Sequence, residues 1–498
     1  MDALVRGGIC AYTQCGAPGR RGRTGGAARS DGGMKITVFG AAGGEVTGSA
    51  YLVETPRAAL LVECGMFSGE GQAAERNHPR ALPIGADSIA AVLVTHAHLD
   101  HSGRLPLLAR EGYRGRVYAT AATAEIAALL LRDSAHIQEH DAERLNRRRA
   151  RSGEPPAEPL YTIRDVERII DRFAAVPYHE PVDVAPGVRA VFIEAGHILG
   201  SSSIQLIVDE DGGAKRVVFS GDLGPRETPI VRDFESFGSA DVVFMESTYG
   251  DRDHRPFDES VDEFIAIVGE AAAGKGKILV PTFAVGRAQT LLALLGWTFR
   301  AGRIKPFPMF LDSPMAVEAT GIYLRHPELF DENLAGYVLE WPPGGYLKTL
   351  RTTVSAEDSK AINDHPGPCL VMAGSGMCTG GRILHHLKHN LWRPEAHVVI
   401  VGYQSPGTLG RHLVEGAKRV SVLGEEIAVK ARVHTLGGFS SHAGQKDLLA
   451  WFEALAPARP RLVLTHGGDR ARVALAERIK ERHGIEARLI SEGESVQA

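Results

Sequence analysis

Short runs of apolar and β-branched residues recur along the chain from residue 34 onward, and they end in polar or glycine-rich clusters. Runs of about four to six such residues, bounded by turn signals, predict buried strands. The first runs are 35–39, 59–62, 90–94, 189–193, 216–219 and 241–245. Because side chains at strand ends often carry the chemistry of α/β folds, we expect these clusters to meet at one rim.

Longer segments with helical periodicity accompany a second group of strands. Helices are predicted over 123–151, 258–273 and 286–299, and strands over 277–280, 309–311, 369–372, 397–401 and 461–465. Strands that alternate with helices are typical of a parallel α/β sheet, so we expect a second α/β unit. The length of 498 residues leaves room for two or three domains.

The segment 1–33 follows no apolar period and is rich in glycine and arginine. We expect it to be a disordered tail or an artefact of the assigned translation start. A basic arm that contacts RNA is the alternative. Ordered structure is expected from Met34 onward.

Composition narrows the function classes. The formal net charge of −4 excludes a broadly basic polyanion binder, so any contact with nucleic acid has to be local. Five cysteines without a CxxC pair favour a reducing compartment, and we expect a cytoplasmic protein. No apolar run approaches the roughly 18–20 residues of a spanning helix, so no membrane partner is expected.

The strongest chemical signal is the sequence His-Ala-His-Leu-Asp-His, which follows the predicted strand 90–94. It supplies His96, His98, Asp100 and His101. His96 and His98 can point to the same side of an extended strand end, and the next two side chains can reach a second point once the chain turns. Imidazole and carboxylate groups are the ligands of catalytic zinc-like ions, so the motif predicts a metal centre.

Further residues at predicted strand ends fit a centre with two ions. Asp222 is suited to bridge the ions, His197 adds an imidazole, and His466 can complete the coordination shell of the second ion. Two ions a few ångströms apart form a template for phosphodiester hydrolysis by a metal-activated water. His442, in Ser-Ser-His-Ala-Gly, is our candidate for the group that protonates the leaving oxygen.

These residues resemble the signature of the metallo-β-lactamase superfamily. Motifs at 40–49, 246–250, 281–287, 311–315, 374–377 and 437–443 resemble its β-CASP branch, the nucleic-acid-processing nucleases that include the cleavage and polyadenylation endonuclease and bacterial and archaeal ribonucleases. The resemblance spans residue 34 to about 492. It implies an αββα sandwich built from 34–250 and 441–498, with a parallel α/β β-CASP domain inserted over 251–440.

The resemblance also implies two zinc ions per chain, and it assigns each side chain of the predicted centre as a ligand of one of these ions. One ion would be held by His96, His98 and His197, the other by Asp100, His101 and His466, with Asp222 bridging them.

Three positions bear on chemistry and substrate. Glu246 matches an acidic residue that supports the ligands, and His442 matches a histidine that contacts the scissile phosphate. With Asp100, these two are the expected catalytic residues. A histidine at the position of His466 is typical of RNA-cleaving members, whereas DNA-repair members usually carry valine. The resemblance therefore implies an RNA substrate.

Two positions depart from the family pattern. Glu63 stands where the family usually has aspartate, and its extra methylene is expected to shift the groups around the metal ligands and to slow catalysis. The first glycine-rich loop is one residue longer, at Gly43 and Gly44. Neither change removes a ligand.

Candidates for RNA contacts lie in the inserted segment. The hydroxyl of Ser375 and the backbone around Gly376, ahead of a helix expected near residue 381, are suited to hold a phosphate. A plain strand–helix turn is the alternative. Arg287, Arg382 and Arg411 are weaker candidates, because surface arginines are usually solvated.

We therefore expect a zinc-dependent ribonuclease that cuts single-stranded RNA during RNA processing or decay. Two alternative enzyme functions would use the same metal centre: a DNA nuclease, and a hydrolase of small esters or lactams. The non-enzyme alternative is an inactive RNA-binding scaffold. Endonuclease and 5′→3′ exonuclease action both remain open, and a homodimer is one expected oligomeric state.

Overall fold

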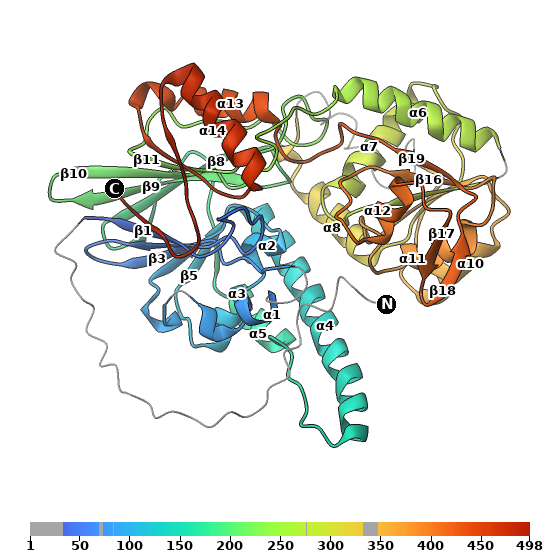
Figure 1. Ribbon diagram of the computed structural model, residues 1–498, viewed down its shortest axis with the longest axis horizontal. Helices are drawn as coiled ribbons and strands as arrows, with labels where there is room; N and C mark the ends of the chain where they lie inside the picture. The colour runs from blue at the N-terminus through green and yellow to red at the C-terminus, as the bar shows by residue number, and fades with distance from the viewer. Residues whose placement is uncertain (1–32, 69–72, 83, 275, 332–346) are drawn as a thin grey trace.

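A computed structural model describes residues 33–68, 73–82, 84–274, 276–331 and 347–498. The expected tail, 1–33, lies outside the described residues except for Gly33. Figure 1 shows two units side by side: a pair of stacked sheets with helices on their outer faces, and a second α/β unit. The long helix α4 (Ala121–Ser152) projects from the first unit.

The first sheet of the stacked pair is mixed. Its strand order is β22-β1-β2-β3-β4-β5-β6. Neighbours from β22 to β3 are antiparallel, and neighbours from β3 to β6 are parallel. The strands are β1 (Lys35–Val38), β2 (Tyr51–Glu54), β3 (Ala59–Val62), β4 (Ala91–Leu93), β5 (Arg116–Ala119), β6 (Phe173–Ala175) and β22 (Ser495–Gln497).

The second sheet is also mixed, with the order β21-β20-β11-β10-β9-β8-β7. Neighbours from β7 to β10 are antiparallel, and neighbours from β10 to β21 are parallel. The strands are β7 (Val182–Ala185), β8 (Val188–Glu194), β9 (Ser202–Glu210), β10 (Gly213–Phe219), β11 (Val242–Met245), β20 (Arg461–Leu464) and β21 (Ala487–Leu489).

The inner faces of these sheets share one apolar core. Val53 and Leu60 of the first sheet are buried in the same cluster as Phe192, Phe219 and Phe244 of the second. On the outer faces, α3 and α5 pack on the first sheet, and α13 and α14 pack on the second. Because each amphipathic element must bury its apolar side, this arrangement is a four-layer αββα sandwich, as predicted.

The second unit contains an all-parallel sheet, which confirms the predicted parallel α/β unit. Its order is β14-β13-β15-β12-β16-β19. The central strands are buried along their whole length, as expected for a sheet covered on both faces. The strands are β12 (Lys277–Pro281), β13 (Met309–Leu311), β14 (Leu350–Thr352), β15 (Cys369–Ala373), β16 (His397–Ile400) and β19 (Arg432–Thr435), with a hairpin of β17 (Arg419–Val422) and β18 (Glu425–Ala428).

Helices connect the strands of both units, and the three predicted helices correspond to α4, α6 and α7. The first unit holds α1 (Ala73–Arg76), α2 (Leu99–Ser102), α3 (Leu105–Arg110), α4, α5 (Ile163–Ile170), α13 (Gln445–Glu453) and α14 (Asp469–His483). The second holds α6 (Phe257–Ala273), α7 (Arg287–Arg300), α8 (Pro314–Arg325), α10 (Ala356–Asp364), α11 (Ile383–Asn390) and α12 (Leu409–Val414). Among these described helices, none has the length and apolar character that a bilayer crossing requires.

The apolar pattern did not reveal every strand. Strand β9 begins with Ser202 and Ser203, which are buried although they are polar. Their hydroxyls donate to the carbonyls of Thr95 and Ser220, at 3.0 and 2.8 Å. Satisfied hydroxyls can enter a core without an apolar run to mark them. The chain leaves the sandwich after β11 and returns before α13, and the proposed boundaries at 250/251 and 440/441 stay predictions.

Candidate metal centre

The His-Ala-His-Leu-Asp-His motif leaves β4 and enters the short helix α2. His96 is buried in the segment after the strand, and His98 immediately precedes the helix. Asp100 and His101 lie on the helix itself. The turn expected between the two pairs of side chains is therefore the first turn of α2.

The other predicted metal ligands, and the predicted supporting residue Glu246, follow strands of the second sheet. His197 follows β8, Asp222 follows β10, Glu246 follows β11 and His466 follows β20. These four strands run in the same direction, so their carboxyl ends lie at the same edge of the sheet. The predicted meeting of strand ends at one rim is present here.

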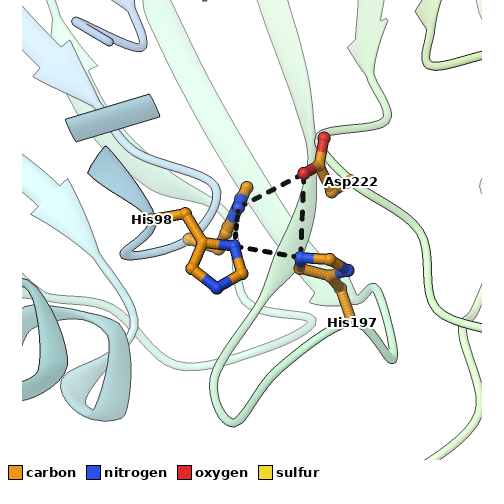
Figure 2. A group of neighbouring side chains, drawn as sticks. His98, His197 and Asp222 are labelled. Carbon is orange, nitrogen blue, oxygen red and sulfur yellow. Dashed lines mark hydrogen bonds and ion pairs between the residues drawn. The ribbon is translucent and has the colours of Figure 1, made fainter. Parts of the chain in front are cut away.

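One group of donor atoms consists of His96, His98, His197 and Asp222. His98 Nδ1 lies 3.2 Å from His96 Nε2 and 3.1 Å from His197 Nε2. Asp222 Oδ2 lies 3.5 Å from His96 Nε2 and 3.7 Å from His197 Nε2. Figure 2 shows the side chains of His98, His197 and Asp222 converging.

These spacings fit a zinc ion. Bonds of about 2.0–2.1 Å place the corners of a tetrahedral shell about 3.3–3.4 Å apart. The donor atoms of His96, His98, His197 and Asp222 are spaced close to that value. The donor set, three imidazoles and one carboxylate, is also one that zinc favours.

A second group consists of Asp100, His101 and His466. His466 Nε2 lies 3.3 Å from His101 Nε2 and 3.6 Å from Asp100 Oδ2. Asp222 Oδ1 lies 3.3 Å from His101 Nε2. Asp222 thus directs one oxygen to each group, and its Oδ1 accepts no hydrogen bond from any described residue. A buried carboxylate oxygen left in this state is suited to bind a cation.

Outer partners orient the imidazole rings. His197 Nδ1 donates to the Ser441 carbonyl at 2.7 Å. His466 Nδ1 lies 3.1 Å from the Thr248 hydroxyl oxygen. Because these partners occupy Nδ1, both rings turn Nε2 toward the cluster, as the ligands of a metal centre require.

Glu63 reaches the same region from the end of β3. Its Oε1 accepts a hydrogen bond from the Thr95 N–H at 2.7 Å, and its Oε2 lies 3.2 Å from His101 Nδ1. The longer side chain therefore still faces the ligand that it was expected to support. The expected slowing of catalysis by this residue stays a prediction.

A third group joins His442 to the carboxylates of Asp222 and Glu246. His442 Nδ1 lies 3.5 Å from Glu246 Oε1 and 3.9 Å from Asp222 Oδ2. Glu246 accepts from the backbone N–H groups of Leu223 at 2.7 Å and Thr248 at 3.2 Å. Since Nδ1 of His442 faces these carboxylates, Nε2 is the atom left for a substrate.

The charge state of the first donor group suits cation binding. Burial lowers the pKa of His96, His98 and His197, so these imidazoles are neutral near pH 7 and each keeps a lone pair. Burial opposes a charge on His442 as well, but the Glu246 and Asp222 carboxylates outweigh it and raise the pKa of His442 to about 9.

The structure places the predicted RNA contacts of the second unit at the carboxyl edge of its sheet. The Ser375 hydroxyl accepts from the N–H groups of Thr379 at 2.9 Å and Gly380 at 3.2 Å, so it serves its own turn. The helix expected near residue 381 begins at Ile383. The phosphate-binding role of Ser375 and Gly376 stays a prediction.

The three candidate arginines differ in their partners. Arg382 forms an ion pair with the buried Asp312, with Nη1 at 2.8 Å from Oδ1. Arg411 pairs with Glu415 on the same helix at 2.7 Å. Arg287 donates no side-chain hydrogen bond within the described parts of the chain, and its Nε is buried without a partner. Of the three, Arg287 alone has no ion-pair partner among the residues that the structure describes, and the RNA-contact roles of all three stay predictions.

Two exposed aromatic residues were missed by sequence reasoning. Phe283 follows β12 with 45% of its surface exposed, and Tyr403 follows β16 with 54% exposed. Phe283 lies within a motif that was recognised for its arginine, and Tyr403 follows an apolar strand. Neither position has a periodic pattern that would distinguish an exposed ring from a buried one.

Family models match most of the described chain. The metallo-beta-lactamase superfamily matches residues 43–282, and the Beta-Casp domain matches residues 288–413. A model described as the Zn-dependent metallo-hydrolase RNA specificity domain matches residues 426–490. This last region contains both His442 and His466.

Similar proteins include two curated relatives and a solved structure. Ribonuclease TTHA0252 of Thermus thermophilus is 42% identical over 465 residues, which cover 93% of this chain and 100% of the relative. Transcription termination factor FttA of Methanosarcina mazei is 30% identical, over 93% of this chain and 71% of the relative.

A crystal structure of a protein of unknown function from Enterococcus faecalis shares the fold. Its TM-score is 0.55 at 13% identity, over 93% of this chain and 100% of that chain. Together with the αββα sandwich, the parallel second unit and the His/Asp cluster, these matches establish the family. The chain belongs to the metallo-β-lactamase superfamily, as a member with β-CASP and RNA-specificity regions.

Proposed function

We propose that this protein is a zinc-dependent ribonuclease that hydrolyses phosphodiester bonds of single-stranded RNA, in RNA processing or decay. The observation that carries the proposal is the pair of donor groups with Asp222 between them, one carboxylate oxygen near His96 and the other near His101, and with His442 beside them. Two bound zinc ions would supply an activated water and neutralise negative charge at the scissile phosphate. The first would be held by His96, His98 and His197.

The second ion would be held by Asp100, His101 and His466, with Asp222 common to both. His442 is proposed to donate a proton from Nε2 to the leaving oxygen, because its Nδ1 is directed at Glu246. Glu246 acts through His442 and is therefore a positioning residue. Its own carboxylate is fixed by two backbone N–H groups.

RNA is favoured over the alternative substrates by the region 426–490, which matches an RNA specificity domain and carries His442 and His466. The second α/β unit beside the centre adds an extended surface, which a small ester or lactam would not use. The complete donor groups argue against an inactive scaffold. A zinc content near zero in the purified protein would revive that alternative.

The test is a side-by-side assay of the purified protein on single-stranded RNA, DNA of the same sequence and a chromogenic lactam. We expect cleavage of RNA, and loss of cleavage in Asp100→Ala and His442→Ala. His179→Ala is the matched control, because His179 is an exposed histidine paired with Glu235. Full activity in both site variants, or preferential turnover of DNA or lactam, would overturn the proposal.

The cleavage mode is read from end-labelled RNA that carries a 5′-triphosphate, monophosphate or hydroxyl group. A ladder from the 5′ end indicates an exonuclease, and internal cuts indicate an endonuclease. A cytoplasmic location stays a prediction, and the buried free thiols of Cys64, Cys369 and Cys378 are compatible with it. The homodimer also stays a prediction, which light scattering of the full chain tests.

A further inference from the structure

The loop between β12 and α7, residues 282–286, spans the seam between the two units. At one end, the Phe283 ring lies on the backbone of Gly376, where an added Cβ would come within 2.8 Å of the ring. At the other end, an added Cβ on Gly286 would lie 3.2 Å from Ile198 Cγ2. Ile198 adjoins the ligand His197, so this loop runs from the edge of the second sheet to the metal centre.

The outer part of the loop presents an aromatic surface. Phe283 and Tyr403 follow β12 and β16, which are neighbours in the parallel sheet, so both lie at its carboxyl edge. The Phe283 ring comes within 4.0 Å of a Cβ position on Gly402, the residue before Tyr403. Both residues are about half exposed. Ligands of open α/β sheets bind at this edge.

The inner end of the loop presents a cation. Arg287 lines a cavity of about 50 Å³ at the seam, together with His197, Thr290, Ser440 and Ser441. Burial lowers the pKa of Arg287 to about 10, so the guanidinium keeps its charge at neutral pH. A partly buried guanidinium with no carboxylate partner among the described residues favours an anion, and phosphate is well matched to its planar donors.

The aromatic outer end of the loop is suited to bind nucleotide bases, and the cationic inner end is suited to bind phosphate, so a single nucleic-acid strand could occupy both. Exposed aromatic faces stack on unpaired bases, and each stack contributes about 1–3 kcal/mol without reading the sequence. A neighbouring arginine binds the phosphate of the same strand. A folded protein or a small lactam offers no such alternation of flat apolar groups and single negative charges.

We propose that Phe283, Tyr403 and Arg287 form a nucleotide track that leads single-stranded RNA to the metal centre. Phe283 and Tyr403 stack on unpaired bases, and Arg287 binds a backbone phosphate close to the scissile bond. This inference rests on the proposed ribonuclease function and names the element that positions its substrate. It also predicts a preference for unpaired RNA, because bases held in a duplex are not free to stack on the rings.

The test compares Phe283→Ala and Tyr403→Ala with Trp392→Ala. Trp392 is the matched control, since it is 50% exposed but follows α11 and precedes β16, at the opposite edge of the sheet. We expect each track variant to weaken RNA binding about 5- to 100-fold, seen as a higher KM with kcat little changed. Trp392→Ala should match the wild type.

Arg287→Met should also raise KM and should reduce the slope of log affinity against log salt by about one phosphate contact. Hydrolysis of bis(p-nitrophenyl) phosphate, which has neither stacked bases nor a flanking phosphate, should stay unchanged in Phe283→Ala and Tyr403→Ala. Bound zinc should stay at the wild-type level. A loss of zinc or of small-diester hydrolysis would show a structural role and would overturn the track.

A second experiment uses chemically modified RNA substrates. Abasic sites should abolish the difference between wild type and the two aromatic variants, and a neutral methylphosphonate at one position should do so for Arg287→Met. Track variants that bind RNA like Trp392→Ala, in a wild type that cleaves RNA, would overturn the track alone. A wild type that cleaves no RNA would overturn the ribonuclease function instead.

Discussion

Asp222 and Asp312 are both buried and both contact histidine, but they differ in how their negative charge is balanced. Asp312, at the end of β13, accepts from His386 at 2.6 Å, Ser359 at 2.6 Å and Arg382 at 2.8 Å, and from the Thr353 hydroxyl. Protein groups alone satisfy this carboxylate. The cluster therefore stabilises the second unit.

Asp222 is enclosed to the same degree but is left incomplete. Its oxygens lie 3.3–3.9 Å from five imidazoles, and Oδ1 has no hydrogen-bond donor within the described residues. Burial keeps His96 and His197 neutral, and neutral imidazole nitrogens that face a carboxylate oxygen at this spacing are suited to share a cation with it. The comparison shows how a buried carboxylate built for stability differs from one built for metal binding.

The largest expected effect is at Asp222. Asp222→Asn keeps the shape but removes the charge and one anionic ligand atom from both donor groups. RNA cleavage should fall to the background, and bound zinc, measured by mass spectrometry, should fall below the wild-type ratio. The equivalent change Asp312→Asn serves as control, since it should leave the zinc ratio unchanged. Equal zinc loss in both variants would contradict the distinction between a metal-binding Asp222 and a structural Asp312.

The next effect is on stability. Asp312→Asn leaves the Arg382 guanidinium beside a neutral group, and breaking a buried pair in this way costs about 3–5 kcal/mol. Urea unfolding should show a lower midpoint for Asp312→Asn than for the wild type. An unchanged midpoint would mean that the Asp312 cluster is not structural.

The same variant should also change the acid response. Burial opposes the charge on Asp312, but its four donors outweigh burial and hold its pKa below the usual range. With an unfolded pKa of about 3.9, Asp312 contributes stability above roughly pH 4 that is lost as the pH falls through the folded pKa. Asp312→Asn should therefore flatten the loss of stability below pH 4.

A smaller effect is expected at Glu63. Its carboxylate faces His101 Nδ1, and the loss of such an outer partner typically costs 10–100-fold in metal affinity or activity. Glu63→Ala should reach that range in zinc affinity measured by competition with a chelator. Glu63→Asp, the residue usual in the family, should retain more affinity than Glu63→Ala. Wild-type zinc affinity in Glu63→Ala would show that Glu63 does not support the metal ligands.

The smallest effect is expected at the exposed Arg411–Glu415 pair. Arg411→Ala should leave the urea midpoint of unfolding close to that of the wild type, because exposed ion pairs contribute little to stability. RNA cleavage should stay within about twofold of the wild type, in contrast to Arg287→Met. A tenfold loss of cleavage would make Arg411 an RNA contact after all.

The sequence predicted which side chains the fold brings together at the candidate metal centre, because these residues sit in a local motif and at strand ends. His96, His98 and Asp100 are neighbours in the chain, and Asp222 follows a plainly apolar strand. The parallel second sheet was predictable for the same reason, since buried strands of such a sheet read as continuous apolar runs.

Partners distant in sequence were not predictable. Arg382 stays a candidate RNA contact, but its ion pair with Asp312, 70 positions away, could not be read from the sequence. The exposure of Phe283 and Tyr403 depends on which edge of the sheet each loop reaches. These features follow from tertiary packing, which periodicity does not encode.

The central claim is that Asp222 joins two zinc sites that together cleave RNA. The most direct measurement is stepwise return of zinc to chelator-treated, metal-free protein while RNA cleavage is followed. The account predicts no cleavage without metal and full recovery at about two zinc ions per chain. Undiminished cleavage by the metal-free protein would contradict it.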